Sequence, residues 1–444
     1  MFILRDLFFA LQTPFADSKL GRERSLWFMF TLLAVIVPFT SSMSSNLLRA
    51  LQTLFGLDLG RRRFYTFMAS PKIPWKPLWQ TLWHLIPEPA QEDRLLVALD
   101  DSINRKTGRK IFACGFFHDH TAKLNQSSYP CSQNIVTIGL LKVIKGRWCC
   151  LPLAFRFYFM KKDIEAKALT TQQGGLSLPF QSKMEQAVEM LTSLAAQFTD
   201  KPILVVADSW FGNDGLLRPL SQSPFRFQLL SRLRSNTQIY GLPVKRSAQQ
   251  RGRTRKYGAR QGSVSDLAVQ YRAQARWLSV CLYGKRREVL AYHRIVMLKN
   301  LRKQARVVWV FRNSRWVALF TTDLNLSSQQ IIEYYGARWK IESGFKEIKQ
   351  DLGSAKSQNR TPSAVNNHLQ FCMMAATITW IYADRIKIDP ERRHLVKGRT
   401  SFAFSDVRRL IANAALSDDF IRLWPIKHKS PQNSFVSILL RMVA

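Results

Sequence analysis

Two short apolar runs, each closed by an aspartate, place the strongest limit on how this chain can fold. Residues 95–99 (LLVAL) precede Asp100, and residues 203–207 (ILVVA) precede Asp208. Five consecutive apolar residues that stop at a polar one are typical of a strand buried on both faces of a sheet. Further strands are predicted at 110–117, 135–143 and 148–159, and helices at 183–198 and 212–219. Strands followed by helices in this order predict an α/β fold.

Both ends of the chain are predicted to be largely helical. The amphipathic segment 46–56, a short turn and the basic, aromatic segment 61–70 fit a helix-turn-helix, with three arginines opening its second helix. The alternative is a small helical bundle with a solvated basic corner. The prolines in 71–77 predict a linker. Near the other end, an apolar helix is expected at 361–386 and an amphipathic one at 404–415.

These patterns divide the chain into five segments. Short strand-like runs recur after residue 225, at 225–230, 277–283, 288–292, 307–311 and 316–321. We therefore expect a helical DNA-binding domain, a first part of the α/β core, a β-rich insertion, a second part of the core and a basic C-terminal region, in residues 1–90, 91–225, 226–325, 326–388 and 389–444.

The charge of the chain indicates a polyanionic partner. Lys and Arg number 66 against 30 Asp and Glu, a formal net charge of +36. Chains this basic usually bind nucleic acid, and the even spread of charge favours a long DNA-contacting surface. Residues 232–260 contain nine Lys or Arg and no acidic residue. A loop of this kind suits phosphate contact, for which we expect Arg251, Arg253, Arg255 and Lys256, although a merely solvated loop is the alternative.

Cysteines and hydropathy indicate a cytoplasmic protein. The six cysteines are scattered with no CxxC pair or zinc spacing, so we expect reduced, buried thiols. The apolar run 26–39 is short for a membrane span and contains Pro38. We expect a buried helix there and no membrane; a signal peptide is the alternative. The sequence His118-Asp119-His120 could suggest a metal clip, but without a third ligand nearby we expect a polar loop.

Residues 331–352 are predicted to form one amphipathic helix. At about 100° per residue, Tyr335, Arg338, Glu342 and Lys349 form one polar row beside an apolar stripe. A carboxylate among two cations and a tyrosine hydroxyl suits a divalent metal beside a DNA phosphate. The alternative for this helix alone is an exposed face with weak ion pairs.

Three carboxylates are candidates for one metal site. Asp100 and Asp208 are each expected at the end of a central strand, and Glu342 on the late helix. Carboxylates at the ends of adjacent strands point into the same crevice, and three of them can hold two Mg²⁺ ions. An Asx-turn or helix cap is the alternative for each single aspartate. Asp101 is also a candidate ligand, because neighbouring residues of a strand point to opposite faces and only one of the two aspartates can line the site.

The polar row completes a known motif. The spacing Tyr-x2-Arg-x3-Glu-x6-Lys at Tyr335, Arg338, Glu342 and Lys349, together with strand-closing aspartates in the form Asp100-x-Ser102 and ILVVAD, resembles the DDE transposases of the IS-four superfamily of bacterial insertion sequences. The resemblance covers about residues 90–385, and its Asp-x-Ser pattern favours Asp100 as the metal ligand, with Asp101 as the second choice. It implies an RNase H-like core, a mixed sheet flanked by helices, which a β-rich insertion interrupts.

The resemblance also implies the activity. Members of the superfamily cleave DNA and transfer strands at the terminal inverted repeats of an element, in cut-and-paste transposition. It implies two Mg²⁺ ions, for which Mn²⁺ can substitute, double-stranded DNA as substrate and target, a homodimer on paired ends, and a bacterial, nucleoid-associated location. Tyr335, Arg338 and Lys349 would hold phosphates. A base flipped from a hairpin intermediate would stack on an aromatic of the insertion, with Trp277, Trp309 and Trp316 as candidates or as core residues.

Three other functions remain open at this point. A transposase-derived, non-catalytic DNA-binding protein would share the charge but gain nothing from three carboxylates beside phosphates. A nuclease with an RNase H-like fold would cleave without strand transfer. A basic membrane-surface protein would use residues 26–39.

Overall fold

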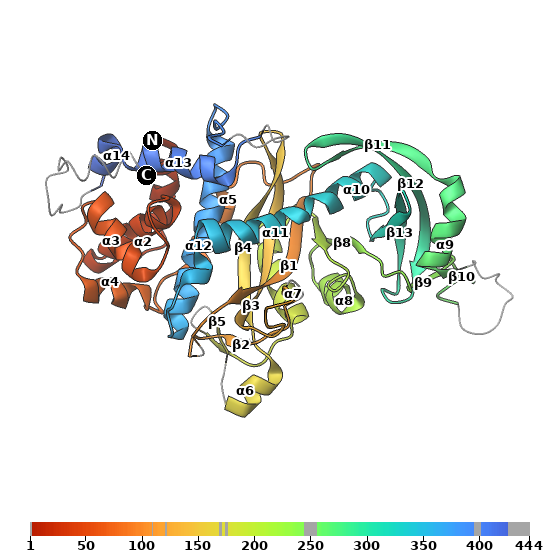
Figure 1. Cartoon of the computed structure of the whole chain (residues 1–444), viewed down its shortest axis with the longest axis horizontal. Helices are drawn as coiled ribbons and strands as arrows, with labels where there is room; N and C mark the ends of the chain where they lie inside the picture. The colour runs from red at the N-terminus through yellow and green to blue at the C-terminus, as the bar shows by residue number, and fades with distance from the viewer. Residues whose placement is uncertain are drawn as a thin grey trace.

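The computed structural model describes residues 2–108, 110–119, 122–167, 171–173, 176–243, 255–394 and 401–424. Within these ranges, the chain forms one large mixed sheet with helices on both of its faces (Figure 1). Helices from the N-terminal and C-terminal parts of the chain gather at one end of the sheet, and strands from residues 238–312 form the other end. This architecture confirms the predicted α/β class.

The sheet has twelve strands in the described part of the chain. A path of ten runs in the order β10-β9-β12-β13-β14-β8-β7-β1-β3-β2, while β11 pairs with β12 and β4 with β3. The strands are β1 (Leu95–Arg105), β2 (Cys114–Phe116), β3 (Cys131–Ile144), β4 (Arg147–Tyr158), β7 (Ile203–Ala207), β8 (Phe227–Arg232), β9 (Gln238–Tyr240), β10 (Arg260–Ser263), β11 (Arg276–Leu282), β12 (Lys285–Leu298), β13 (Lys303–Arg312) and β14 (Arg315–Thr321). A separate pair is formed by β5 (Thr171–Gln173) and β6 (Leu176–Leu178).

The centre of the sheet is built from the two apolar runs. Strand β7 lies between β1 and β8 and is parallel to both, while β3 is antiparallel to β1. All five residues of β7 and the first five of β1 are buried, because helices cover both faces of the sheet there. The strands of residues 260–321 continue the same sheet, since β14 pairs with β8.

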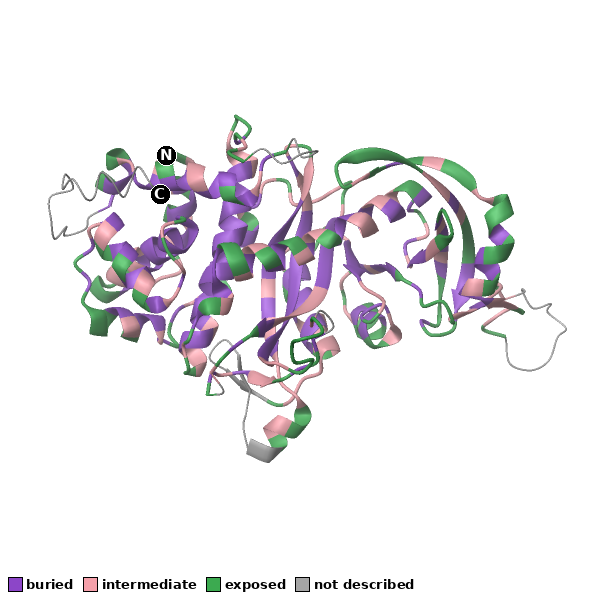
Figure 2. Cartoon of the chain, in the orientation of Figure 1, coloured by how far each residue is buried: buried purple, intermediate pink, exposed green. Residues whose placement is uncertain are grey.

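Helices cover the two faces of this centre separately. On one face, α10 (Ser328–Ala337) and α11 (Trp339–Lys346) pack on Leu96, Ala98 and Val206. On the other face, α7 (Lys183–Ala195) and α8 (Asp214–Gln222) pack on residues of opposite parity. Figure 2 shows the buried strands between these layers. Helix α7 begins with a capping box formed by Ser182 and Glu185. It confirms the predicted helix at 183–198 but ends at Ala195.

The N-terminal helices pack on a long helix from the C-terminal part. They are α1 (Phe2–Gln12), α2 (Lys19–Ile36), α3 (Ser44–Leu54), α4 (Arg61–Met68) and α5 (Trp75–His84), and they meet α12 (Pro362–Arg385), α13 (Phe404–Ala415) and α14 (Asp418–Arg422). The apolar run of α2 is buried against α12, which confirms the expected buried helix. Among the described residues, no helix is long and apolar enough to cross a membrane.

The predicted proline linker at 71–77 is wrong, because α5 begins inside it. Pro77 stands in the first turn of α5, where its missing N–H breaks no helical hydrogen bond. Three tryptophans on α5 fix the helix to the core through their indole N–H groups. Trp75 donates to Asn367, Trp79 to Gln370 and Trp83 to the carbonyl of Leu153.

Other local expectations need smaller corrections. The strand predicted at 110–117 is reduced to β2, because only its last residues pair with β3. Two small helices complete the fold, α6 (Lys161–Lys167) and α9 (Val264–Tyr271). The helix at 404–415 forms as predicted. The six cysteines form no disulfide, and three are buried, but Cys281 is exposed, so the expectation of uniformly buried thiols is wrong.

Candidate functional site

Two aspartates lie side by side at the centre of the sheet. The parallel register pairs Leu99 with Ala207, so Asp100, the next residue of β1, lies beside Asp208, which directly follows β7. Both have the parity of the residues that face α10 and α11. The prediction that Asp100 ends its strand is wrong, because β1 continues to Arg105 along the longer strand β3. Asp100 instead marks the point where β1 loses its partner β7.

Asp208 follows β7 directly and also organises the loop after it. Its Oδ1 accepts hydrogen bonds from the backbone N–H groups of Trp210 and Phe211, at 3.0 and 3.1 Å. The hydroxyl of Ser231 donates to its carbonyl at 2.6 Å. The turn that was the alternative for this aspartate is therefore present, and it still leaves the carboxylate beside Asp100.

Asp101 points to the opposite face of β1. Its Oδ2 forms an ion pair with Nζ of Lys183 at 2.8 Å and accepts a hydrogen bond from Nδ2 of Asn134 at 3.2 Å. Lys183 is the first residue of α7, so this carboxylate serves the α7 side of the sheet. The structure thus separates the two adjacent aspartates, Asp100 toward α11 and Asp101 toward α7.

The predicted helix at 331–352 forms as three successive helical pieces. They are α10, α11 and a π-turn at Glu347–Asp351 that begins directly after Lys346. Between α10 and α11, the N–H of Arg338 bonds to the carbonyl of Tyr335, a tighter turn than the α-helical pattern. The predicted apolar stripe is buried, at Tyr334, Ile341, Phe345, Ile348 and Leu352.

Arg338 joins two of the predicted carboxylates. Its Nη1 donates to Oδ2 of Asp100 and its Nη2 to Oε1 of Glu342, both at 2.9 Å. The arginine is only 7% exposed, so its guanidinium is held beneath the helix rather than on the surface. Arg338 therefore faces the sheet, and the alternative of an exposed face with weak ion pairs is wrong for this residue.

Tyr335 and Lys349 occupy the two ends of the row. Burial raises the pKa of Tyr335, whose ring lies 5.7 Å from the Arg338 guanidinium and whose surroundings include Arg232 and Asp208. At the other end, the ammonium of Lys349 donates to the hydroxyl of Ser102 and to the carbonyl of Ile103. Burial lowers the pKa of Lys349 to about 8. This lysine therefore ties the helix to β1 just beyond the aspartates.

Negative charge is crowded at Asp100. Burial raises the pKa of Asp100 to about 7, the Arg338 guanidinium opposes the rise, and the Asp208 and Asp101 carboxylates add to it. Among the described residues, no group of three His, Cys, Asp or Glu side chains is arranged to hold a metal ion. The guanidinium of Arg338 stands between Asp100 and Glu342 and forms an ion pair with each of them.

The donor set nevertheless fits a divalent cation. Asp100 and Asp208 follow the paired residues Leu99 and Ala207, their charges interact, and Glu342 is bound to the same guanidinium as Asp100. Carboxylate oxygens are the ligands that Mg²⁺ prefers, and a cation there would offset the like charges that add to the effect of burial on the pKa of Asp100.

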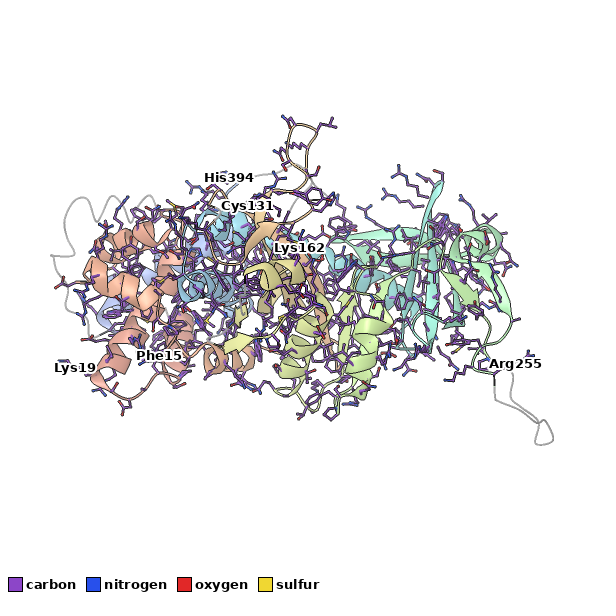
Figure 3. The ribbon with its side chains drawn as sticks, turned by 90° about the horizontal axis from the view of Figure 1, so that it is seen from below. Phe15, Lys19, Cys131, Lys162, Arg255 and His394 are labelled. Carbon is purple, nitrogen blue, oxygen red and sulfur yellow. The ribbon has the colours of Figure 1, made fainter. Side chains whose placement is uncertain are left out.

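Other predicted residues lie away from this cluster. Arg255 and Lys256 are exposed, and Figure 3 shows Arg255 at the far end of the molecule from Lys19. Arg251, Arg253 and His120 lie outside the described residues. Asp119 pairs with Arg105, as expected for a polar loop.

The three tryptophans proposed for base stacking lie on the face opposite α10. Trp309 is fully buried and donates to the carbonyl of Val264, so it is a core residue. Trp316 is partly buried against the same core. Trp277 is 68% exposed, but its neighbours Arg276 and Leu278 in β11, not Trp277 itself, have the parity that faces α10.

Sequence reasoning missed two residues beside the site. Lys183 and Trp210 flank Asp101 and Asp208, and the ammonium of Lys183 lies over the rings of Tyr158 and Trp210, at 5.1 and 5.5 Å. A tryptophan two positions after a strand-closing aspartate was the available signal for Trp210.

Comparison with known protein families shows which family the chain belongs to. The family model of the DDE superfamily endonucleases matches residues 18–288, more than half of the chain. The chain belongs to this family. The matched range contains Asp100 and Asp208 and ends before Tyr335, Arg338, Glu342 and Lys349. No curated protein matches the chain. A DDE superfamily endonuclease acts on DNA, and such enzymes generally use divalent metal ions.

Proposed function

We propose that this DDE superfamily endonuclease is a transposase of the IS-four type, which cleaves DNA and transfers strands at the terminal inverted repeats of an insertion sequence. The observation that carries the proposal is the position of Asp100 beside Asp208, which directly follows the parallel strand β7, with Arg338 joining Asp100 to Glu342. The full Tyr335, Arg338, Glu342 and Lys349 spacing supports the same type. The core would be RNase H-like, with residues 226–325 as its β-rich insertion.

Asp100, Asp208 and Glu342 are proposed to hold two Mg²⁺ ions, with Mn²⁺ as a substitute. Bound there, the ions would supply activation of water or a DNA 3′-hydroxyl and stabilisation of the leaving oxygen. Asp101 is not needed as a ligand, since Lys183 and Asn134 already neutralise and orient it.

Arg338 has a second task in this proposal. When DNA and cations enter, its guanidinium exchanges the carboxylates for phosphate oxygens, to which its planar fork is equally suited. The hydroxyl of Tyr335, on the same side of the sheet, donates to the neighbouring phosphate. Lys349 keeps the helix on β1 through Ser102 and Ile103, and so sets the distance between Glu342 and the aspartates.

A groove beside Asp208 extends the proposed DNA path. Arg232 and Arg234 line it together with Ser209, in a cavity of about 230 Å³. Both arginines are exposed, and Arg232 also lies near Tyr335. Phosphates that follow the cleaved bond would contact these guanidinium groups before they reach the exposed Arg255 and Lys256. A homodimer on paired ends would place two such paths together.

The test is cleavage of DNA that carries the inverted repeats flanking the reading frame. The wild-type protein should nick this DNA with Mg²⁺ and join a 3′-hydroxyl end to target DNA. Asp100→Asn, Asp208→Asn and Glu342→Gln should each abolish cleavage and keep binding, whereas Asp101→Asn should still cleave.

Three results would contradict the proposal. Normal cleavage by Glu342→Gln would show that Glu342 is not a metal ligand. Binding without cleavage by the wild-type protein would favour the non-catalytic DNA-binding alternative. Cleavage without strand transfer would favour a simple nuclease.

A further inference from the structure

A pocket of about 590 Å³ lies on the α7 side of the sheet, behind the aspartate pair. The end of β4, the first residues of α7 and the loop after β7 meet there, with the segment after β2. Its lining includes Phe116, Tyr129, Tyr158, Lys162, Lys183 and Trp210. Figure 3 shows Lys162 over the middle of the molecule, on the side seen from below.

Aromatic rings at this pocket are unusually exposed. Trp210 is 44% exposed, Phe116 55% and Tyr129 58%. Trp210 is nevertheless held firmly, because its backbone N–H donates to Asp208 and its ring contacts Phe211 with centroids 4.7 Å apart. Several exposed rings in one concave site are costly in water unless a flat ligand covers them.

The cations at the pocket suit an anionic ligand. The ammonium of Lys183 lies between the rings of Tyr158 and Trp210 and is neutralised by Asp101. Lys162 is exposed at the rim, so its charge is available to a ligand. Flat rings with adjacent ammonium groups match a nucleobase and the phosphate next to it.

We propose that this pocket binds one unpaired base of a DNA strand, by stacking on Trp210 while Lys162 contacts the adjacent phosphate. This proposal rests on the proposed DNA substrate and names a second contact for it. Asp208 faces the α11 side, and Trp210 follows it by two residues at the pocket. A strand that passes over the end of β7 therefore reaches both sides. A paired base cannot enter, because its faces are covered by its neighbours in the duplex.

The test compares two DNA probes of the same sequence in the absence of divalent metal. One is fully paired, and the other carries 2-aminopurine in a single-nucleotide bulge. Fluorescence anisotropy gives the affinities, and 2-aminopurine emission reports stacking. We expect Trp210→Ala to weaken bulged-DNA binding by about 5- to 150-fold, the range for one base stacked on an aromatic ring. Binding of the paired probe should change by less than about 2-fold.

Matched variants make the result specific. Trp210→Phe should retain most of the affinity, and Trp277→Ala, which removes an exposed tryptophan on β11, should behave as wild type. Wild-type protein should quench 2-aminopurine and Trp210→Ala should not. If Trp210→Ala does not fold, Tyr129→Ala removes another exposed ring of the pocket lining and should also weaken bulged-DNA binding.

Two outcomes would overturn the pocket assignment. One is equal affinity of wild type and Trp210→Ala for the bulged probe, and the other is equally weakened binding by Trp210→Ala and Trp277→Ala. The binding test contains no divalent metal, so its outcome does not depend on cleavage. A failure of Mg²⁺-dependent cleavage would contradict the proposed function without deciding whether the pocket binds an unpaired base.

Discussion

Replacing Glu347 by glutamine should make the protein more stable at neutral and alkaline pH and leave it unchanged in acid. Glu347 begins the π-turn that carries Lys349, and its Oε2 accepts a hydrogen bond from the indole of Trp380 at 3.3 Å. Burial raises the pKa of this carboxyl to about 8, against an ordinary value of 4.5, while Arg147 opposes the rise. The folded state therefore keeps a proton that the unfolded state has lost.

The direction follows from that difference in bound protons. Below pH 4.5 the carboxyl is protonated in both the folded and the unfolded state, and the stability of the fold is then at its full value. As the pH rises from 4.5 toward 8, the unfolded state releases its proton first, which stabilises the unfolded state relative to the folded one. Each pH unit in this window costs the folded state about 1.4 kcal/mol. Between pH 5.5 and pH 7, the wild-type protein should lose about 2 kcal/mol relative to Glu347→Gln.

Urea denaturation at pH 5.5, 6.25 and 7 measures this difference directly. Glu391→Gln is the matched control, because Glu391 is exposed and the same substitution there should shift stability equally at each pH. A constant difference between wild type and Glu347→Gln across the three pH values would show that the folded protein holds Glu347 charged, and the reasoning would be refuted.

Further substitutions test the packing and the DNA path. Asn367→Ala should destabilise the protein by about 3 kcal/mol or more in urea, because the Trp75 indole and the carbonyls of Met68 and Ser70 lose their buried partner, whereas the exposed Asn236→Ala should have little effect. Gly212→Ala should lower thermal stability, because the added Cβ would meet the side chain of Ser231. Adding Ser231→Gly to this variant should restore part of the stability, and wild-type stability of Gly212→Ala alone would contradict the close approach. Lys349→Met should cost about 1–3 kcal/mol, because the bonds to Ser102 and Ile103 are removed, and an unaltered urea midpoint would argue against them. Arg255→Ala with Lys256→Ala should reduce the salt slope of DNA binding by about 0.9 for each phosphate that the variant no longer neutralises, and an unchanged slope would exclude both residues from the DNA path.

The amino-acid sequence alone determined the local elements. Residues 203–207 form a strand and residues 404–415 form a helix, both with the predicted bounds. A strand buried on both faces is a continuous apolar run, whereas a helix buried on one face has apolar residues every three or four positions, so the two patterns can be told apart. The apolar stripe of residues 331–352 was likewise readable from spacing. Charge and motif spacing predicted a DNA enzyme, and membership of the DDE superfamily endonucleases agrees with it.

Only the tertiary structure decided how the polar residues meet. The sequence could not show that Asp100 lies within a strand, because the length of β1 is set by its pairing with β3. The sequence left both Asp100 and Asp101 as candidate ligands. In the structure, Asp100 forms an ion pair with Arg338 on one face of the sheet, and Asp101 forms one with Lys183 on the other. Trp210 and Lys183 could not be recognised as a pair, since a helix, a strand and a loop separate them in the chain. Periodicity records which side of an element is buried, whereas the partner of a charge depends on which elements pack together.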